Sequence, residues 1–231
     1  MTGRKIQYWV IPPDANAEFV ASMEEVLETY EQPYDPNLPV LCMDEQPVQL
    51  TKEVRQPIDA TRSHPKRVDY DYERAGTASL FLFAEPLAGW RMAKARARRT
   101  KMDWALEMAE LLDTRYRDCT RVIVVCDNLN IHTKGAFYEA FEPERAQTYA
   151  KKVQFCYTPK HGSWLNIAEN ELSALTRQCF HGRRIGELQS LCEEVEAWSN
   201  DVNSAQKGVD WQMKVGDARA KLKSVYPKIK F

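Results

Sequence analysis

The chain has 231 residues, of which 44% are apolar and 28% charged, enough for one globular domain with a sizeable hydrophobic core. This composition excludes wholesale disorder, and 9 Gly and 12 Pro exclude a fibrous or low-complexity chain. No long apolar run follows the basic residues near the N-terminus or occurs elsewhere, so we expect neither a signal peptide nor a membrane span. The formal net charge of −1 gives no overall attraction to nucleic acid, so any DNA binding must come from local basic clusters.

No two cysteines form a C-x-x-C motif, and most of them lie inside apolar segments. They are Cys42, Cys119, Cys126, Cys156, Cys179 and Cys192. We therefore expect reduced, buried thiols in a cytosolic protein.

Two stretches are strongly basic: residues 91–101 contain no acidic side chain, and residues 210–231 contain only two. A basic run is usually a solvated face, but the absence of any acid in residues 91–101 favours contacts with DNA phosphates. The cations of this run are Arg91, Lys94, Arg96, Arg98, Arg99 and Lys101.

In chain order, apolar residues three and four apart predict a helix over residues 15–30, followed by a proline-rich linker. Residues 40–43 are a short apolar run that stops at Asp44, the pattern of a buried strand with a carboxylate at its end. Apolar or aromatic residues that alternate with acidic residues, a turn signal at Gly76 and a second apolar run together predict a β-hairpin over residues 67–84.

The rest of the chain alternates predicted helices and short apolar strands. We expect helices over 104–116, 135–150, 165–180, 185–202 and 217–222, and strands over 122–126 and 153–157. This order implies a mixed sheet that is covered by helices on both faces.

Asp44 and Asp127 each follow a wholly apolar strand, and ligand sites in open α/β sheets gather at such strand ends. If the two strands are parallel neighbours about 4.8 Å apart, both carboxylates can reach one divalent ion. Carboxylates alone favour Mg²⁺, and phosphoryl transfer is its natural chemistry. The helix over 165–180 offers Glu169 or Glu171 for a second ion, but these point about 200° apart and cannot serve the same site.

Several motifs together carry a family resemblance. They are MDE at 43–45, VVCDNLNIH at 124–132, TPKHGSWLNIAENELSALTRQ at 158–178, YERAGTASLFLFAEPLAGW at 72–90, RRTKMDWA at 98–105 and WQMKVGDARAKLKSVYP at 211–227. The first three resemble the signature blocks of DDE-type insertion-sequence transposases, and the whole set is most similar to the bacterial group related to mariner elements.

The resemblance implies an α/β, ribonuclease H-like fold with a mixed five-stranded sheet and helices on both faces. It implies a metal-dependent endonuclease and strand transferase that uses Mg²⁺, for which Mn²⁺ can substitute. Matched position by position, Asp44, Asp127 and Glu169 would be both the catalytic triad and the metal ligands. Glu45 would project to the opposite face of its strand, so we expect a structural or salt-bridging role for it.

The same resemblance implies partners and further contacts. The partners would be transposon-end and target DNA, bound by a homodimer in the bacterial cytoplasm at the nucleoid, with no membrane and no small-molecule cofactor. Further candidate DNA contacts are His132, Lys160, His161, Trp164 and Asn166. A satisfied structural role for His132 and a packing role for Trp164 remain open as alternatives.

The domain organisation expected from this resemblance has three parts. Residues 1–38 would be a helix and linker that once joined a missing helix-turn-helix region, 39–205 the catalytic domain and 206–231 a basic tail. Without a DNA-reading module, two further functions stay open: a catalytically idle transposase derivative that binds DNA or dimerises, and a general ribonuclease H-like nuclease.

Overall fold

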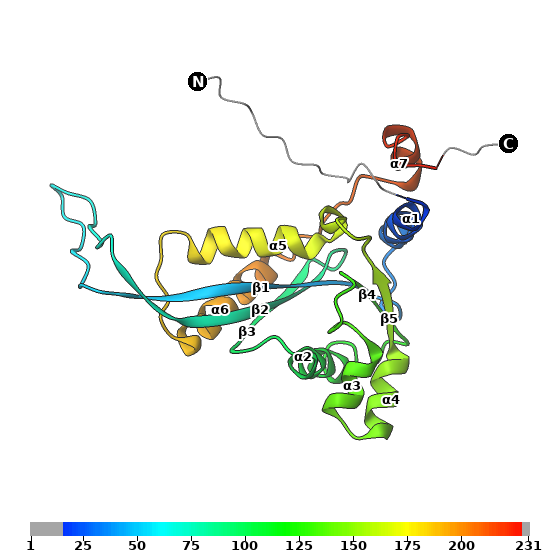
Figure 1. Ribbon diagram of the computed structural model, residues 1–231, viewed down its shortest axis with the longest axis horizontal. Helices are drawn as coiled ribbons and strands as arrows, with labels where there is room; N and C mark the ends of the chain where they lie inside the picture. The colour runs from blue at the N-terminus through cyan, green and yellow to red at the C-terminus, as the bar shows by residue number, and fades with distance from the viewer. Residues whose placement is uncertain (1–15, 228–231) are drawn as a thin grey trace.

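The computed structural model describes residues 16–227, and its centre is a five-stranded mixed sheet in the order β3-β2-β1-β4-β5 (Figure 1). The strands are β1 (Val40–Glu53), β2 (Tyr72–Glu85), β3 (Trp90–Arg96), β4 (Val122–Cys126) and β5 (Val153–Tyr157). β1, β2 and β3 pair antiparallel, whereas β4 runs parallel to both β1 and β5. The expected mixed sheet is therefore confirmed.

Helices cover both faces of this sheet. On one face lie α1 (Ala17–Glu31), α5 (Ile167–Leu175), α6 (Leu188–Ala205) and α7 (Val215–Lys221), with a 3₁₀ turn at Ser163–Leu165 and a π-helical turn at Thr176–Phe180. On the other face lie α2 (Lys101–Asp113), α3 (Lys134–Ala140) and α4 (Pro143–Lys152). Among residues 16–227, no helix is long and apolar enough to cross a membrane.

The alternation of side chains along the central strands divides the core into two clusters. Leu41 and Met43 of β1 pack with α2, α3 and α4, whereas Cys42 between them packs with α1, α5 and α6. This alternation is the ordinary consequence of the pleat, and it fixes which face each residue after Met43 occupies. Asp44 therefore points to the α5 face, and Glu45 points to the α2 face.

The predicted strand end at Asp44 and the predicted hairpin over 67–84 are both wrong. β1 continues through Asp44 to Glu53, because β2 supplies backbone partners along this whole length. Gly76, with φ of 110°, lies inside β2 and does not turn the chain. β1 and β2 instead extend together away from the other strands toward the segment over residues 54–71 (Figure 1).

The other predicted elements are confirmed within a few residues, with one exception. The helix expected over 135–150 is two helices, α3 and α4, because Pro143 starts a new helix and cannot continue the previous one. Residues 1–15 and 228–231, which belong to the predicted N-terminal and C-terminal parts, lie outside the described residues. The described ends pack against each other, since Arg219 of α7 forms an ion pair with Glu24 of α1.

Candidate active site

The register of the sheet brings Asp44 and Asp127 to the same level. β1 pairs with β4 only over three residues, the last pair being Cys42 and Val125. Two residues after this pair come Asp44, which lies within β1, and Asp127, which directly follows the end of β4. The parallel pairing has stopped at this level. Both carboxylates therefore lie at the carboxyl edge of the parallel strands, where α/β sheets bind ligands.

Asn166 attaches the start of α5 to β1 beside Asp44. Its buried side chain caps the helix by accepting a hydrogen bond from the backbone N–H of Ala168 (3.1 Å). The same side chain donates to the backbone carbonyl of Met43 (2.9 Å). This double contact holds the first turn of α5, and with it the exposed Glu169, next to the strand that carries Asp44.

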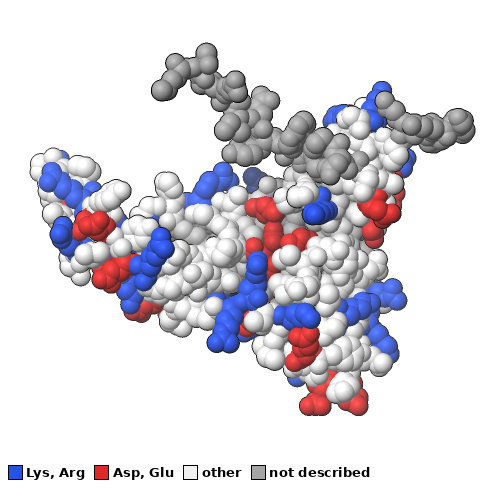
Figure 2. Space-filling model, in the orientation of Figure 1, with Lys and Arg blue, Asp and Glu red and all other residues white. Residues whose placement is uncertain are grey.

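All three carboxylates line one cleft of about 710 Å³. The other residues that line it are Asn16, Glu18, Phe19, Ser22, Asn128, Leu129, Tyr157, Thr158, Pro159, Lys160, His161, Ser163 and Asn166. Figure 2 shows acidic side chains gathered near the middle of the visible face and basic side chains on either side. The cleft thus joins side chains from α1, β1, the segment after β4, the segment after β5 and α5.

The loop after β5 takes a tight course along this cleft. His161 has a positive φ of 63°, a conformation that non-glycine residues adopt rarely and mostly where surrounding contacts impose it. Gly162 donates to the carbonyl of Pro159 (2.8 Å), and a Cβ at Gly162 would come within 2.6 Å of the Pro159 ring. The Pro-Lys-His-Gly sequence therefore needs its glycine, and the turn leaves Lys160 and His161 exposed at the cleft.

The negative charge of the Asp44 carboxylate is unfavourable at its place in the cleft. Burial raises the pKa of its carboxyl to about 7, and the negative charges of Glu169, Glu45 and Asp127 add to this rise. The backbone N–H of Glu45, which donates to Asp44 Oδ1 (2.8 Å), opposes it only in part. Near neutral pH the folded chain therefore carries a carboxylate whose charge is unfavourable in this place.

We expect Asp44→Asn to raise the Tm of the chain at pH 8 in the presence of a chelator. Because the folded-state pKa of Asp44 lies above its unfolded value, the folded state binds more protons between about pH 4 and pH 7. Stability therefore falls as pH rises through this range, and an amide removes the penalty. The Tm difference between the variant and the wild type should shrink toward zero at pH 4, which serves as the internal control. A variant that melts below the wild type at pH 8 would contradict this account.

His132 connects the cleft to the opposite face of the sheet. Its Nδ1 lies 2.8 Å from Asp127 Oδ1 and 3.0 Å from the backbone carbonyl of Asp127, and its Nε2 lies 2.7 Å from Glu45 Oε1. Burial alone would lower the pKa of His132, but hydrogen bonds to Asp127, Cys126 and Glu45 outweigh burial and raise it. Both ring nitrogens face acceptors, which a doubly protonated imidazolium satisfies.

The chemistry of the three cleft carboxylates fits a hard divalent cation. Oxygen ligands from Asp and Glu are those that Mg²⁺ and Mn²⁺ prefer. Among residues 16–227, however, no three His, Cys, Asp or Glu side chains lie close enough together to form a ready-made metal cluster. The three carboxylates line one cleft without forming such a cluster.

Arg91, expected as a DNA contact, is buried instead. Its guanidinium forms an ion pair with Glu171 of α5 (2.8 Å) and donates to the carbonyl of Lys207 (2.6 Å). Glu171 therefore faces away from the cleft that Glu169 lines, as the angle of about 200° between them requires. The side chain of Arg91 is only 9% exposed, so it stabilises the packing of β3 against α5 and cannot reach a phosphate outside.

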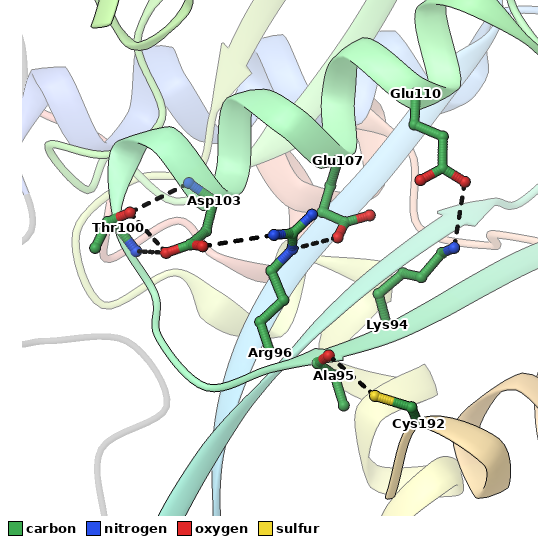
Figure 3. A network of polar contacts seen from close by, with 8 residues as sticks. All are labelled: Lys94, Ala95, Arg96, Thr100, Asp103, Glu107, Glu110 and Cys192. Atoms are coloured by element: carbon green, nitrogen blue, oxygen red, sulfur yellow. Dashed lines mark hydrogen bonds and ion pairs between the residues drawn. The ribbon is translucent and has the colours of Figure 1, made fainter. Parts of the chain in front are cut away.

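The rest of the basic run is also largely neutralised, as Figure 3 shows for its central part. Acidic side chains of α2 pair with two of its cations: Glu110 with Lys94 (3.2 Å), and both Asp103 and Glu107 with Arg96. A fourth ion pair joins Lys101 to Glu139 (2.8 Å). Within residues 16–227, only Arg98 and Arg99 of this run are exposed without an ion pair, and they remain as candidate phosphate contacts.

Two other expected DNA contacts have structural roles. His132 is fully buried, and Asn166 is 2% exposed with both ends of its amide hydrogen-bonded inside the chain. Trp164 is half-buried against the core cluster of α1, α5 and α6, which fits packing. Lys160 and His161 line the cleft and are exposed, so both remain candidates.

No sequence pattern indicates that α1 takes part in this cleft. Asn16, Glu18 and Ser22 line it from the first turns of that helix, and Asn16 also caps α1 by accepting a hydrogen bond from Phe19 (3.0 Å). The acidic face of α1 is typical of an ordinary solvated helix surface. Only the tertiary packing of α1 beside β5 brings these residues to the carboxylates.

A family profile described as "DDE superfamily endonuclease" matches residues 39–192, about two thirds of the chain. The chain belongs to this family. The DDE-type transposase resemblance of the motifs is thereby confirmed, and residues Asp44, Asp127 and Glu169 all lie within the matched range. No curated protein matches the chain in sequence.

Solved structures of mariner transposases share the fold of this DDE family member. The Mos1 mariner paired-end complex with Mn matches with a TM-score of 0.55 and 14% identity, covering 86% of this chain and 59% of that chain. The Mos1 strand transfer complex matches with a TM-score of 0.53 and 12% identity, covering 90% of this chain and 67% of that chain. The expected ribonuclease H-like fold is confirmed, and the chain spans about three fifths of the first of these proteins.

Proposed function

We propose that this chain is the catalytic domain of a DNA transposase that cleaves transposon-end DNA and joins the freed 3′-OH to a target. One observation carries the proposal: Asp44, Asp127 and Glu169 come from three separate elements and line the same cleft at the carboxyl edge of the parallel strands. These residues are the proposed catalytic triad. Two of the mariner structures of the same fold are paired-end complexes, one with Mn and the other with Mg.

In this proposal the triad holds Mg²⁺, for which Mn²⁺ can substitute. When bound, the ions would stabilise the negative charge that develops on the attacking and leaving oxygens. Asp44 and Asp127 would hold one side of the site from the sheet, and Glu169 would close it from α5. The partly enclosed cleft would place the reacting phosphate in surroundings where electrostatic interactions are stronger than in water.

DNA would approach over two groups of exposed cations, one at the cleft and one after β3. Lys160 and His161 stand on the tight loop after β5 and line the cleft itself. Arg98 and Arg99 follow β3 and keep their charge free of acidic partners within residues 16–227. We propose that these four side chains contact phosphates and carry no sequence information, because phosphate contacts position a protein without reading bases.

The proposed catalytic domain spans residues 39–205 and would act as a homodimer on DNA. α1 and α7 pack on the same hydrophobic cluster as α5 and α6, so they support the domain from one face. End-specific recognition would come from a helix placed in the major groove, and α1 is a poor candidate because its polar face is acidic.

A nicking and strand-transfer assay on linear transposon-end DNA tests the proposed function. We expect Mg²⁺-dependent nicks and joined products, both abolished by a chelator. Binding to DNA without any cleavage would instead indicate an idle derivative that regulates a transposase. Cleavage of RNA–DNA hybrids without strand transfer would indicate a general ribonuclease H-like nuclease.

Neutralising Arg98 and Arg99 together should weaken DNA binding by the same factor for every sequence. Each lost phosphate contact lowers the slope of log K against log salt by about 0.9, so the double Arg→Ser variant should lose about 1.8. Filter binding at several salt concentrations measures this slope. The matched control neutralises Lys94 and Lys101, whose acidic partners already compete for their charge, and should change the slope less. An equal change of this slope in both variants would contradict the proposal that Arg98 and Arg99 contact phosphates while Lys94 and Lys101 do not.

A further inference from the structure

His132 is a buried, fully hydrogen-bonded side chain immediately behind the cleft. It is 0% exposed, and both of its ring nitrogens lie within 3.0 Å of oxygen atoms. One nitrogen faces Asp127, which is proposed as a metal ligand, and the other faces Glu45, which is not among the residues that line the candidate cleft. The ring therefore bridges the two faces of the sheet at the level of the candidate site.

Glu45 has no role in the cleft that would explain its burial. Its side chain is 0% exposed, one carboxylate oxygen accepts from His132, and the other has no hydrogen-bond partner within residues 16–227. Burying a carboxylate is unfavourable, and an apolar residue of similar volume often serves stability equally well or better. Stabilisation of the fold alone therefore does not explain the Glu45–His132 pair well.

The surroundings hold the imidazole in one orientation. Trp104 of α2 packs with its ring centroid 5.9 Å from that of His132. The hydroxyl of Tyr157 donates to the backbone carbonyl of His132 (2.7 Å), which attaches the segment before α3 to β5. Packing, backbone and Glu45 together leave the ring little freedom to rotate.

Asp127, in contrast, has little else to orient it. It follows the last residue of β4, its side chain is 41% exposed, and the segment from Asp127 to Thr133 is neither helix nor strand. Besides the ion-pair contact with His132, its carboxylate has only one long hydrogen bond within the described residues, from the backbone N–H of Leu129 (3.4 Å). The contact to His132 at 2.8 Å engages Oδ1 and leaves Oδ2 for the cleft.

We propose that Glu45 and His132 are a positioning pair that orients the Asp127 carboxylate for divalent-metal binding. The pair touches neither substrate nor the cleft and acts only through Asp127. Partners of this kind, which hydrogen-bond to a metal ligand, typically change metal affinity by about 10- to 100-fold when they are removed. The inference rests on the proposed function, because it assumes that Asp127 is a metal ligand.

The test measures Mn²⁺ affinity of the folded chain by calorimetry, separately from DNA cleavage. We expect His132→Leu to weaken Mn²⁺ binding about 10- to 100-fold and Glu45→Leu to weaken it in the same direction. Glu45→Gln should stay near the wild-type affinity, because its amide oxygen still accepts a hydrogen bond from the ring. Raising the Mn²⁺ concentration should restore much of the cleavage rate of His132→Leu.

Glu85→Leu is the matched control for damage to the fold. Glu85 is also buried in the sheet and hydrogen-bonded, to Tyr116 (3.1 Å) and Arg115 (2.8 Å), but it does not line the cleft. This variant should lose stability and keep its Mn²⁺ affinity. If His132→Leu fails to fold, comparing the Mn²⁺ affinities of Glu45→Leu and Glu45→Gln tests the positioning pair equally well.

Two results separate this inference from the function on which it rests. A folded His132→Leu or Glu45→Leu variant that binds Mn²⁺ within twofold of the wild type overturns the positioning pair, whatever the wild type does to DNA. A wild type that binds Mn²⁺ with the expected variant pattern but never cleaves DNA supports the pair and overturns the proposed activity.

Discussion

Replacing Glu169 by glutamine is expected to lower the rate of Mg²⁺-dependent DNA cleavage by about 10³-fold or more. Metal ions contribute several kcal/mol to the stabilisation of a phosphoryl-transfer transition state, and each 1.36 kcal/mol corresponds to a tenfold change in rate. Asp44→Asn and Asp127→Asn should have effects of the same size. Because Glu169 is exposed and has no ion pair within residues 16–227, its substitution should leave the Tm almost unchanged.

Glu171→Gln is the matched control for this prediction. It makes the same chemical change two residues further along α5, on the side that faces Arg91 and away from the cleft. Because it leaves Arg91 without its partner, it should lose stability but keep its cleavage rate at a temperature where it stays folded. Single-turnover cleavage of a labelled transposon-end duplex at saturating Mg²⁺ compares the two variants. Loss of cleavage in Glu171→Gln with full activity in Glu169→Gln would show that the wrong glutamate has been assigned to the triad.

The sequence predicts the fold well where local pattern and tertiary context agree. β4 and β5 are short apolar runs bounded by polar residues, and their observed limits are the predicted ones. The sequence predicts too short a β1 because Asp44, Glu45 and Gln46 are polar, whereas pairing with β2 keeps them extended. Backbone pairing with a distant strand leaves no signal in the local sequence, so neither this extension nor the course of β2 through Gly76 could be predicted.

The candidate site shows the same division between local and tertiary information. Motifs predicted that Asp44, Asp127 and Glu169 belong together, and the structure brings all three to one cleft. The run over residues 91–101 looked free of acid because its partners lie on other elements, among them α2 and α5. Charge patterning reports only neighbours along the chain, and it therefore overestimated how many of these cations are available to DNA.

Arg91 links β3 to two helices, to α5 through its buried ion pair with Glu171 and to α6. Arg91 lies on β3 and Glu171 on α5, and their side chains are only 9% and 13% exposed. The backbone of Arg91 also exchanges two hydrogen bonds with the side chain of Asn203 on α6, each 2.7 Å long. Removing one charge of such a pair leaves the other buried and uncompensated, which is far more unfavourable than the absence of both.

We therefore expect Glu171→Ala to lower the free energy of unfolding by about 3 kcal/mol, a decrease of roughly 6–12 °C in Tm for a chain of this size. The double variant Arg91→Met, Glu171→Leu should recover most of this loss, because well-packed apolar side chains can replace a buried ion pair at little cost. Urea denaturation of the two variants and the wild type measures the difference. Equal stability of Glu171→Ala and the wild type would mean that solvent reaches the pair and that Arg91 is available for other partners, DNA included.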